Sequence, residues 1–343
     1  MAKRNVNIKD VAAKAKVHPS TVSRVLNPGT RSMVSAAVAD RVSRIADEMG
    51  YSRSTLAYGL RTGRTQTIGV VIPDLTNPLF PPIIRQLEHS LAKQGYIAVL
   101  ADSDNDQKNE MAIVKSLKAR NVDGLILATA HRRDSVVSAC VEEHIPLVLV
   151  NRTIDAHSVT AVINDDERGI ELAASHLVGL GHKSIAYLGG PQNTSTGHDR
   201  FLAFKKLMRS GMFKSHDDLI INCKAFTESE GHSGFLSILK KRRKFTAVIA
   251  ANDLLALGCY DAMQERGLRC PADIAVTGFN DMPFMNRLSP PLTTLRIPHG
   301  EIGDEAAKLL LERIHNPEAR VKTIKLLPEL IIRGSTAAPK NKR

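Results

Sequence analysis

The sequence lacks several features that would assign it quickly to a class of protein. Its four cysteines, Cys140, Cys223, Cys259 and Cys270, show no C-x-x-C spacing, so it indicates neither a disulfide framework nor a zinc site. The first residues are polar, unlike a signal peptide, and no apolar run is long enough to cross a membrane. We therefore expect a cytoplasmic protein with no membrane partner.

Motifs of common enzymes are also missing. The sequence contains no G-x-S-x-G, no P-loop and no H-E-x-x-H. The stretch GLGHKS is similar to the start of a dinucleotide-binding loop, but it precedes an expected strand instead of following one. We therefore expect no catalysis, no cofactor and no metal ion, although proteins with α/β bodies are often enzymes.

The basic charge lies at the two ends of the chain. A length of 343 residues suggests two or three domains, and the net charge is +12. Residues 1–64 hold twelve Lys and Arg against four Asp and Glu, the last four residues KNKR are also basic, and the rest is nearly neutral. A basic, non-repetitive N-terminal segment predicts a polyanionic partner such as nucleic acid, because Lys and Arg displace counterions from phosphates.

The N-terminal segment predicts two short helices joined by a tight turn. Apolar residues at positions 8, 11, 12 and 15 share one helical face, behind Asn7 as the N-cap. In VHPSTVSRVLN, His18 occupies the cap and Pro19 the first helical position. Val22, Val25 and Leu26 then pack inward, and a third helix is expected at about 35–49. The outward residues are Pro19, Ser20, Thr21, Ser23 and Arg24.

Two short helices on a basic background are typical of the helix-turn-helix, whose second helix enters the major groove of DNA. Arg24 suits guanine, because two of its donors reach O6 and N7 together, whereas Ser20 serves donor or acceptor edges. Thr21 and Ser23 are expected to hold phosphates. The alternative is an ordinary helical hairpin whose hydroxyls are solvated.

The remainder of the chain alternates apolar strands with amphipathic helices, which predicts parallel sheets covered by helices. The length of about 270 residues predicts two such sheets. The expected strands are TIGVVIPD, IAVLADSD, DGLILATA, PLVLVN, TAVIND, SIAYLGG, LIINCKAF, FTAVIAAND and DIAVTGFND.

Several of these strands end in polar residues, namely Asn151, Asn164 with Asp165, Asn252 with Asp253, and Asn280 with Asp281. In open parallel sheets, ligands bind beyond the carboxyl ends of the strands. Capping of the following helix is the alternative at each single position. Because the pattern recurs in both halves of the body, it favours a ligand cleft.

The stretches IKDVAAKAKVHPSTVSRVLN and EMGYSRSTLAYGLRTGRTQTIGVVIPDLTNPLF resemble the lactose/galactose repressor (LacI/GalR) family of bacterial transcription regulators, in order over nearly the whole chain. The resemblance implies a helix-turn-helix and a two-lobed body like that of a periplasmic binding protein. It implies that Ser20 and Arg24 read bases and that Pro19 offers an apolar contact. His18 stands where the family often has a capping serine. The DNA-binding set also includes Thr21, Ser23 and Asn27.

The linker at 53–65 corresponds, by the same resemblance, to a hinge helix that folds on DNA. Leu60 then occupies the position of a side chain inserted into the minor groove, with Ala57 beside it. A plain flexible tether is the alternative, because Gly59 weakens a helix by about 1 kcal/mol relative to Ala.

By resemblance, the body binds a small effector between its lobes. The implied contacts are Leu79, Phe80, Asn151 and Arg152 from the first lobe and Arg200, Asn252 and Asn280 from the second. Many members of the family have Asp where this chain has Asn280. Loss of that carboxylate beside two arginines predicts an acidic effector, such as a sugar acid. The alternative for Arg152 is a surface salt bridge.

The expected organisation is a headpiece at 1–52, the linker, a body at 66–337 and a disordered basic tail at 338–343. The first lobe is expected at about 66–163 and 294–325, and the second at about 164–293 and 326–337. We expect a homodimer that represses transcription from a pseudo-palindromic operator on double-stranded DNA. The alternatives are a solute-binding protein without a DNA role, an activator, and a regulator that needs a corepressor.

Overall fold

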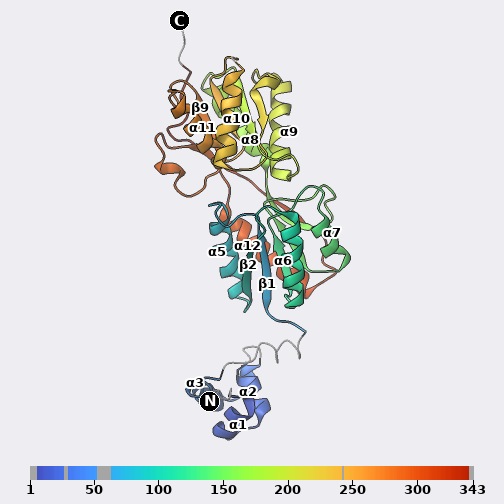
Figure 1. Ribbon diagram of the computed structural model, residues 1–343. Helices are drawn as coiled ribbons and strands as arrows, with labels where there is room; N and C mark the ends of the chain where they lie inside the picture. The colour runs from blue at the N-terminus through green and yellow to red at the C-terminus, as the bar shows by residue number, and fades with distance from the viewer. Residues whose placement is uncertain (1–5, 27–29, 52–62, 242, 340–343) are drawn as a thin grey trace. The chain divides into compact units, whose positions relative to one another are not determined.

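The computed structural model describes residues 6–26, 30–51, 63–241 and 243–339. The chain divides into two compact units, Met1–Gln66 and Thr67–Arg343. The described part of the first unit is helical, and the second unit contains two lobes, each built around a six-stranded sheet (Figure 1). Within the described ranges, no helix has both the length and the apolar character that crossing a bilayer requires.

The helices of the first unit are α1 (Ile8–Ala15), α2 (Pro19–Val25), the 3-10 helix η1 (Arg31–Met33) and α3 (Ala36–Glu48). Asn7 caps α1, as the sequence predicts, and the structure adds a capping box between Asn7 and Asp10. Lys16 takes a left-handed conformation with φ of 51°, which makes the tight turn before α2. Val11 of α1, Val22 of α2 and Val42 of α3 are fully buried in one small core. The predicted arrangement of three helices is confirmed.

The first lobe has a parallel sheet with the strand order β11-β5-β4-β3-β1-β2. These strands are β1 (Thr67–Ile72), β2 (Ile97–Asp102), β3 (Gly124–Leu127), β4 (Leu147–Val150), β5 (Thr160–Asn164) and β11 (Thr323–Leu326). Its helices are α5 (Phe80–Ala92), α6 (Gln107–Ala119), α7 (Ser135–Glu142) and α12 (His299–His315). Val70 packs in one apolar cluster with α5 and α12, and Val71 in another with α6 and α7, so the helices cover both faces.

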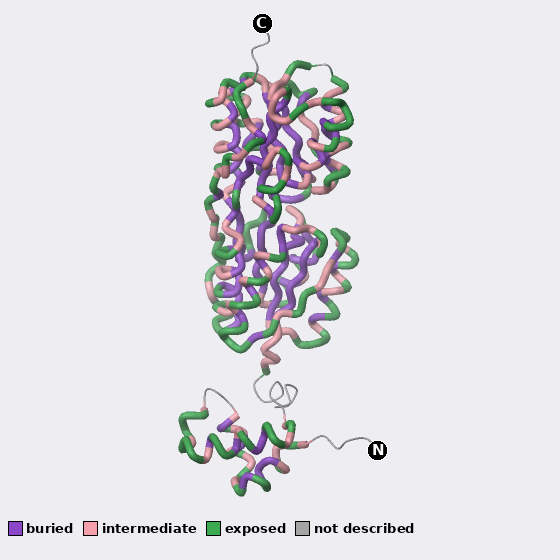
Figure 2. Tube along the Cα trace, turned by 90° about the vertical axis from the view of Figure 1, so that its left-hand side faces the viewer, coloured by how far each residue is buried: buried purple, intermediate pink, exposed green. Residues whose placement is uncertain are grey.

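The second lobe has the strand order β12-β10-β9-β8-β6-β7, in which β12 runs antiparallel to β10 and the other neighbours pair in parallel. These strands are β6 (Ile185–Gly189), β7 (Ile220–Asn222), β8 (Ala247–Ala250), β9 (Ala275–Asn280), β10 (Thr293–Arg296) and β12 (Glu329–Ile331). The helices are α8 (Asp166–Gly179), α9 (Ser195–Arg209), α10 (Glu228–Lys240) and α11 (Asp253–Glu265). Helix α8 packs with α9, and α10 packs with α11. The central strands of both lobes are buried (Figure 2).

All nine predicted strands of the body are present, and the predicted fold class is confirmed. One expected boundary is wrong, because the return to the first lobe does not begin at residue 294. Strand β10, Thr293–Arg296, pairs with β9 and belongs to the second sheet, and α12 is the first element after it that packs in the first lobe. The stretch TTLR is too short and too polar for its sequence to show which sheet it joins, and only its pairing with β9 assigns it to the second sheet.

Candidate functional site

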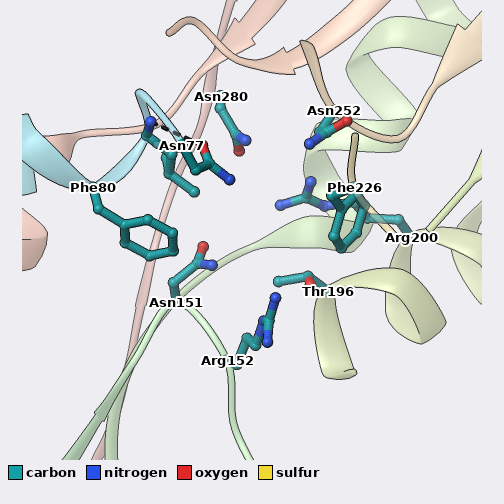
Figure 3. Close-up of a pocket in the computed structure, with 10 residues that line it drawn as sticks. Asn77, Phe80, Asn151, Arg152, Thr196, Arg200, Phe226, Asn252 and Asn280 are labelled. Atoms are coloured by element: carbon teal, nitrogen blue, oxygen red, sulfur yellow. Dashed lines mark hydrogen bonds between the residues drawn. The ribbon is translucent and has the colours of Figure 1, made fainter. Parts of the chain in front are cut away.

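A pocket lies between the two lobes, where residues from the two sides face one another (Figure 3). It is lined by Asn77, Leu79, Phe80, Asn151, Arg152, Thr196, Arg200, Phe226, Asn252 and Asn280. Its volume of ≈ 20 Å³ is about the space that one water molecule needs. The lining side chains therefore leave little free space between the lobes at this point.

All seven residues predicted to contact an effector line this pocket, so the structure brings the predicted set together. Three lining residues were missed by the sequence analysis: Asn77, Thr196 and Phe226. Asn77 precedes α5, Thr196 lies in the first turn of α9, and Phe226 follows β7. The only signal was the proximity of Asn77 to Leu79 in DLTNPL, since Thr196 and Phe226 stand in no motif.

Arg200 is fixed by partners within the second lobe. Its Nε donates to Asp166 Oδ1 at 2.7 Å, and its Nη1 donates to the carbonyl oxygen of Ala251 at 2.6 Å. Its Cζ lies 3.7 Å from the centroid of the Phe279 ring, which is within cation–π range. Burial raises the pKa of Asp166 to about 6, although Arg200 opposes this rise. The charge of Arg200 is thus largely matched by a buried carboxylate.

Arg152 is held more loosely, within the first lobe. Its Nη1 donates to the carbonyl oxygen of Thr129 at 3.2 Å, while its Nε is buried without a partner among the described residues. Burial lowers the pKa of Arg152 to about 10, and nearby Glu110 opposes this. Arg152 is only 7% exposed and forms no ion pair with a described residue, so the predicted alternative of a surface salt bridge is wrong.

Glu110 is a buried carboxyl close to Arg152. Its Oε1 accepts a hydrogen bond from the hydroxyl of Thr129, the residue whose carbonyl holds Arg152. Burial raises the pKa of Glu110 to about 7, while the bond from Thr129 and the charge of Arg152 act in the opposite direction. At neutral pH, this carboxyl therefore balances only part of the charge of Arg152.

The amides of the pocket differ in their partners, and Asn151 Oδ1 accepts a hydrogen bond from Asn164 Nδ2 at 3.3 Å. Asn252 is the N-cap of α11, and its Oδ1 accepts from the backbone N–H of Leu255 at 2.9 Å, so the capping alternative is right for this oxygen. Asn151 and Asn280 have φ values of 64° and 114°, which turn the chain out of the sheet. Asn280 Oδ1 is buried with no hydrogen-bond partner among the described residues.

The acidic residues beside these amides have structural partners. Asp165 caps α8 by accepting from the backbone N–H of Arg168 at 2.9 Å. Asp253 accepts from the backbone N–H of Met282 at 2.8 Å and from the hydroxyl of Thr294, which fixes the loop that carries Asn280. Burial raises the pKa of Asp253 to about 7. Neither Asp165 nor Asp253 lines the pocket.

Hydrogen bonds between the lobes hold the pocket closed at one edge. The backbone N–H of Thr153, in the first lobe, donates to Ser195 Oγ at the start of α9 at 3.0 Å. The backbone N–H of Arg132 donates to the carbonyl oxygen of Asn193 at 2.8 Å. An outer chamber of ≈ 150 Å³ adjoins this edge and shares Asn77, Arg152 and Phe226 with the pocket.

The second helix of the first unit presents the predicted DNA-reading side chains. Ser20 and Arg24 are exposed, whereas Pro19, Thr21 and Ser23 are half-buried. His18 is the N-cap and accepts from the backbone N–H of Ser20 at 3.2 Å, which confirms the predicted cap. Three residues of the predicted DNA-binding set, Asn27, Ala57 and Leu60, lie outside the described residues.

Both parts of the chain, the helical first unit and the two-lobed second unit, match known protein families. Residues 7–54 match the family described as bacterial regulatory proteins, lacI family, and residues 174–336 match a periplasmic binding protein-like domain. The ribose operon repressor of Haemophilus influenzae is 32% identical over 330 residues, which cover 96% of this chain and 98% of that protein. The HTH-type transcriptional repressor PurR of Klebsiella pneumoniae is 32% identical over 332 residues, or 96% of each chain.

Solved structures show the same similarity. The Lac repressor dimer bound to operator and the anti-inducer ONPF has a TM-score of 0.85 at 27% identity, covering 98% of this chain and all of that one. A LacI family transcriptional regulator from Enterococcus faecium with bound ribose has a TM-score of 0.69 at 32% identity, covering 80% of this chain and all of that one.

Proposed function

This chain belongs to the lacI family of bacterial regulatory proteins, and from that premise we propose that a small acidic molecule, bound between its lobes, controls its affinity for operator DNA. The protein is a DNA-binding transcriptional repressor with an effector-binding body. Its similarity to the operator-bound Lac repressor supports action as a dimer on a two-part operator. The repressors that it matches are regulators of transcription and not enzymes.

We propose that helix α2 reads the operator in the major groove. Arg24 and Ser20 contact bases, Pro19 makes an apolar contact, and Thr21, Ser23 and His18 lie against phosphates. The exposed guanidinium of Arg24 and the two small hydroxyls on the same short helix support this assignment. The proposed set extends to Asn27, and to Ala57 and Leu60 of the linker.

One observation supports an acidic effector above the others. The ten residues that line the pocket include two arginines and no carboxylate. Arg200 already has Asp166 as its counter-ion, so the charge available to a ligand is chiefly that of Arg152. A carboxylate ligand would match this charge and accept from the free Arg152 Nε. The amides of Asn151, Asn252 and Asn280 are suited to hydroxyls of the same molecule.

The test is thermal unfolding of the purified full chain with neutral sugars, the corresponding sugar acids, small carboxylates and purines. A ligand that binds only the folded state adds about 2.7 kcal/mol at 100 times its dissociation constant. A shift of the melting temperature with an acid, and a smaller one with its neutral sugar, would support the proposal. A shift confined to neutral sugars or purines would contradict it.

The direction of control follows from a second measurement with the same ligand. Operator affinity is compared with and without the ligand by titration of labelled duplex DNA. A fall in affinity identifies an inducer, and a rise identifies a corepressor. A coupling free energy of about 1–3 kcal/mol is typical between two such sites.

A further inference from the structure

The N-cap of α2 places two hydrogen bonds on one nitrogen of His18. Pro19, the first residue of the helix, has no N–H, so the N–H of Ser20 is the first donor that needs a partner. This N–H donates to His18 Nδ1 at 3.2 Å. The hydroxyl oxygen of Ser20 lies 2.8 Å from the same Nδ1. The ring therefore contacts both the backbone N–H and the hydroxyl of Ser20.

The backbone bond determines the direction of the side-chain bond. A backbone N–H can only donate, so Nδ1 must be an acceptor without a proton, and in the neutral ring the proton lies on Nε2. A hydroxyl close to an unprotonated acceptor donates its single proton to it. The Ser20 hydroxyl is thus committed as a donor toward His18, and its lone pairs remain for an outside partner.

We propose that His18 fixes the Ser20 hydroxyl as a hydrogen-bond acceptor toward DNA, so that Ser20 selects a base with an amino group, adenine or cytosine, over one with a keto group, guanine or thymine. In the major groove, adenine N6 and cytosine N4 are donors, whereas guanine O6 and thymine O4 are acceptors. This inference rests on the proposed role of α2 in reading the operator.

The consequence for recognition is specific. Each base pair contains one amino base and one keto base, so an acceptor on one strand reads the orientation of the pair and not its composition. A serine hydroxyl without such a neighbour rotates and serves either class. Arg24 has only donors and selects acceptors, which are found on guanine. Helix α2 would therefore present a hydrogen-bond acceptor, Ser20, and a hydrogen-bond donor, Arg24, to the bases, one helical turn apart.

The experiment begins with selection of duplexes by the full-length protein from a randomised library. Selection with Ser20→Ala then identifies the position that Ser20 reads, since its preference changes there. With the wild-type protein, duplexes with adenine or cytosine at this position on the contacted strand should bind about threefold to tenfold more tightly than those with thymine or guanine. Replacing that adenine by purine, which has no amino group, should remove the advantage.

Variants at His18 test the cause. With His18→Ala the hydroxyl is free to rotate, and the preference for amino bases should fall to about twofold or less. With His18→Asp, whose carboxylate accepts from both the N–H and the hydroxyl of Ser20, the preference should be retained even if overall affinity falls. The preference is the ratio of the affinities for the duplexes with an amino base and with a keto base, and a general loss of stability does not affect this ratio. If His18→Ala does not fold, the inference is still tested by two results: the preference for amino bases in His18→Asp, and its loss in wild type when adenine is replaced by purine.

Ser23→Ala is the matched control, because it removes another hydroxyl of α2 and should weaken binding evenly across sequences. A keto base selected at the Ser20 position, an unchanged preference in His18→Ala, or no position that responds to Ser20→Ala would overturn the inference. If the wild-type protein enriches no sequence, either alone or with the ligand identified by thermal unfolding, the proposed operator-reading function itself is wrong.

Discussion

The two arginines of the pocket come from different lobes and are held in opposite ways. Arg200, in the second lobe, has a buried carboxylate at 2.7 Å, a backbone carbonyl and an aromatic ring as partners. Arg152, in the first lobe, has one carbonyl at 3.2 Å and an unpartnered Nε among the described residues. Two side chains of one type in one pocket therefore differ in what they offer a ligand.

The two arginines therefore have different roles in the pocket: one is fixed in position by its partners, and the other keeps a charge that its neighbours balance only in part. Arg200 is part of the frame of the second lobe, because removing it would leave Asp166 buried without its counter-ion. Arg152 keeps a charge that is incompletely balanced by Glu110, whose pKa is about 7. The second lobe thus contributes a fixed donor, and in the proposed mode of binding the first lobe contributes the charge that selects an acidic ligand.

The largest effect should come from breaking the pair in the second lobe. Arg200→Met should lower the free energy of unfolding by about 3–5 kcal/mol, because Asp166 is left as an uncompensated buried acid. Arg152→Met breaks no ion pair and should cost clearly less. Urea unfolding of both variants at pH 7 measures the difference, and Arg200→Met with Asp166→Asn should recover part of the loss. Equal losses in the two single variants would contradict the comparison.

Glu110 should make the stability of the first lobe depend on pH. Its folded pKa of about 7 lies above the ordinary value of 4.5, so the folded state binds this proton more tightly than the unfolded state. The carboxyl therefore lowers stability as the pH rises from 4.5 to 7, by up to about 3 kcal/mol. Glu110→Gln should remove this loss, so its advantage over wild type should grow through that window and level off above pH 7.

Urea unfolding of Glu110→Gln between pH 4.5 and 8 provides the measurement. Glu142→Gln replaces an exposed carboxyl on α7 and is the matched control, whose curve should follow that of wild type. A constant difference between Glu110→Gln and wild type across the window would show that Glu110 has an ordinary pKa.

Measurements of ligand binding should distinguish the effect of the Arg152 charge from that of the hydrogen bonds around it. If the effector is acidic, Arg152→Met should weaken its binding by about 1.5–3 kcal/mol, the usual contribution of a hydrogen bond to a charged group. Binding of the neutral sugar of the same carbon skeleton should change little. Calorimetric titration of both ligands gives the two values, and an equal loss for acid and neutral sugar would show that Arg152 does not act through charge.

The smallest effect should come from a contact between the lobes. Ser195→Ala removes the acceptor for the Thr153 N–H and should cost about 1 kcal/mol or less. Hydrogen exchange at the Thr153 amide should become faster by about fivefold as the lobes part more often. Ser138→Ala, whose hydroxyl bonds to Asp134 within the first lobe, is the control and should leave Thr153 unchanged. Unchanged protection in Ser195→Ala would mean that this bond does not hold the lobes together.

Local patterns predicted most of the fold. The nine expected strands are present because each is a short apolar run bounded by polar residues, and the caps of α1 and α2 are present because capping depends on neighbours within three residues. Strands β10, β11 and β12 were missed. They are short and partly polar, and β11 pairs with β5, which lies far away in the sequence.

The site was predicted in part. The seven expected residues line one pocket, but Thr196 and Phe226 carry no motif, and only the approach of the lobes brings them there. Resemblance indicated Arg200 as an effector contact without revealing its counter-ion. Asp166 is 34 residues away in the chain, at the start of another helix.

The sequence by itself determined the helix-turn-helix and the succession of strands and helices, because caps, turns and hydrophobic periodicity act over a few residues. Tertiary structure alone decided which of the two arginines has its charge matched, because burial and the nearest counter-ion depend on chain segments far apart in sequence.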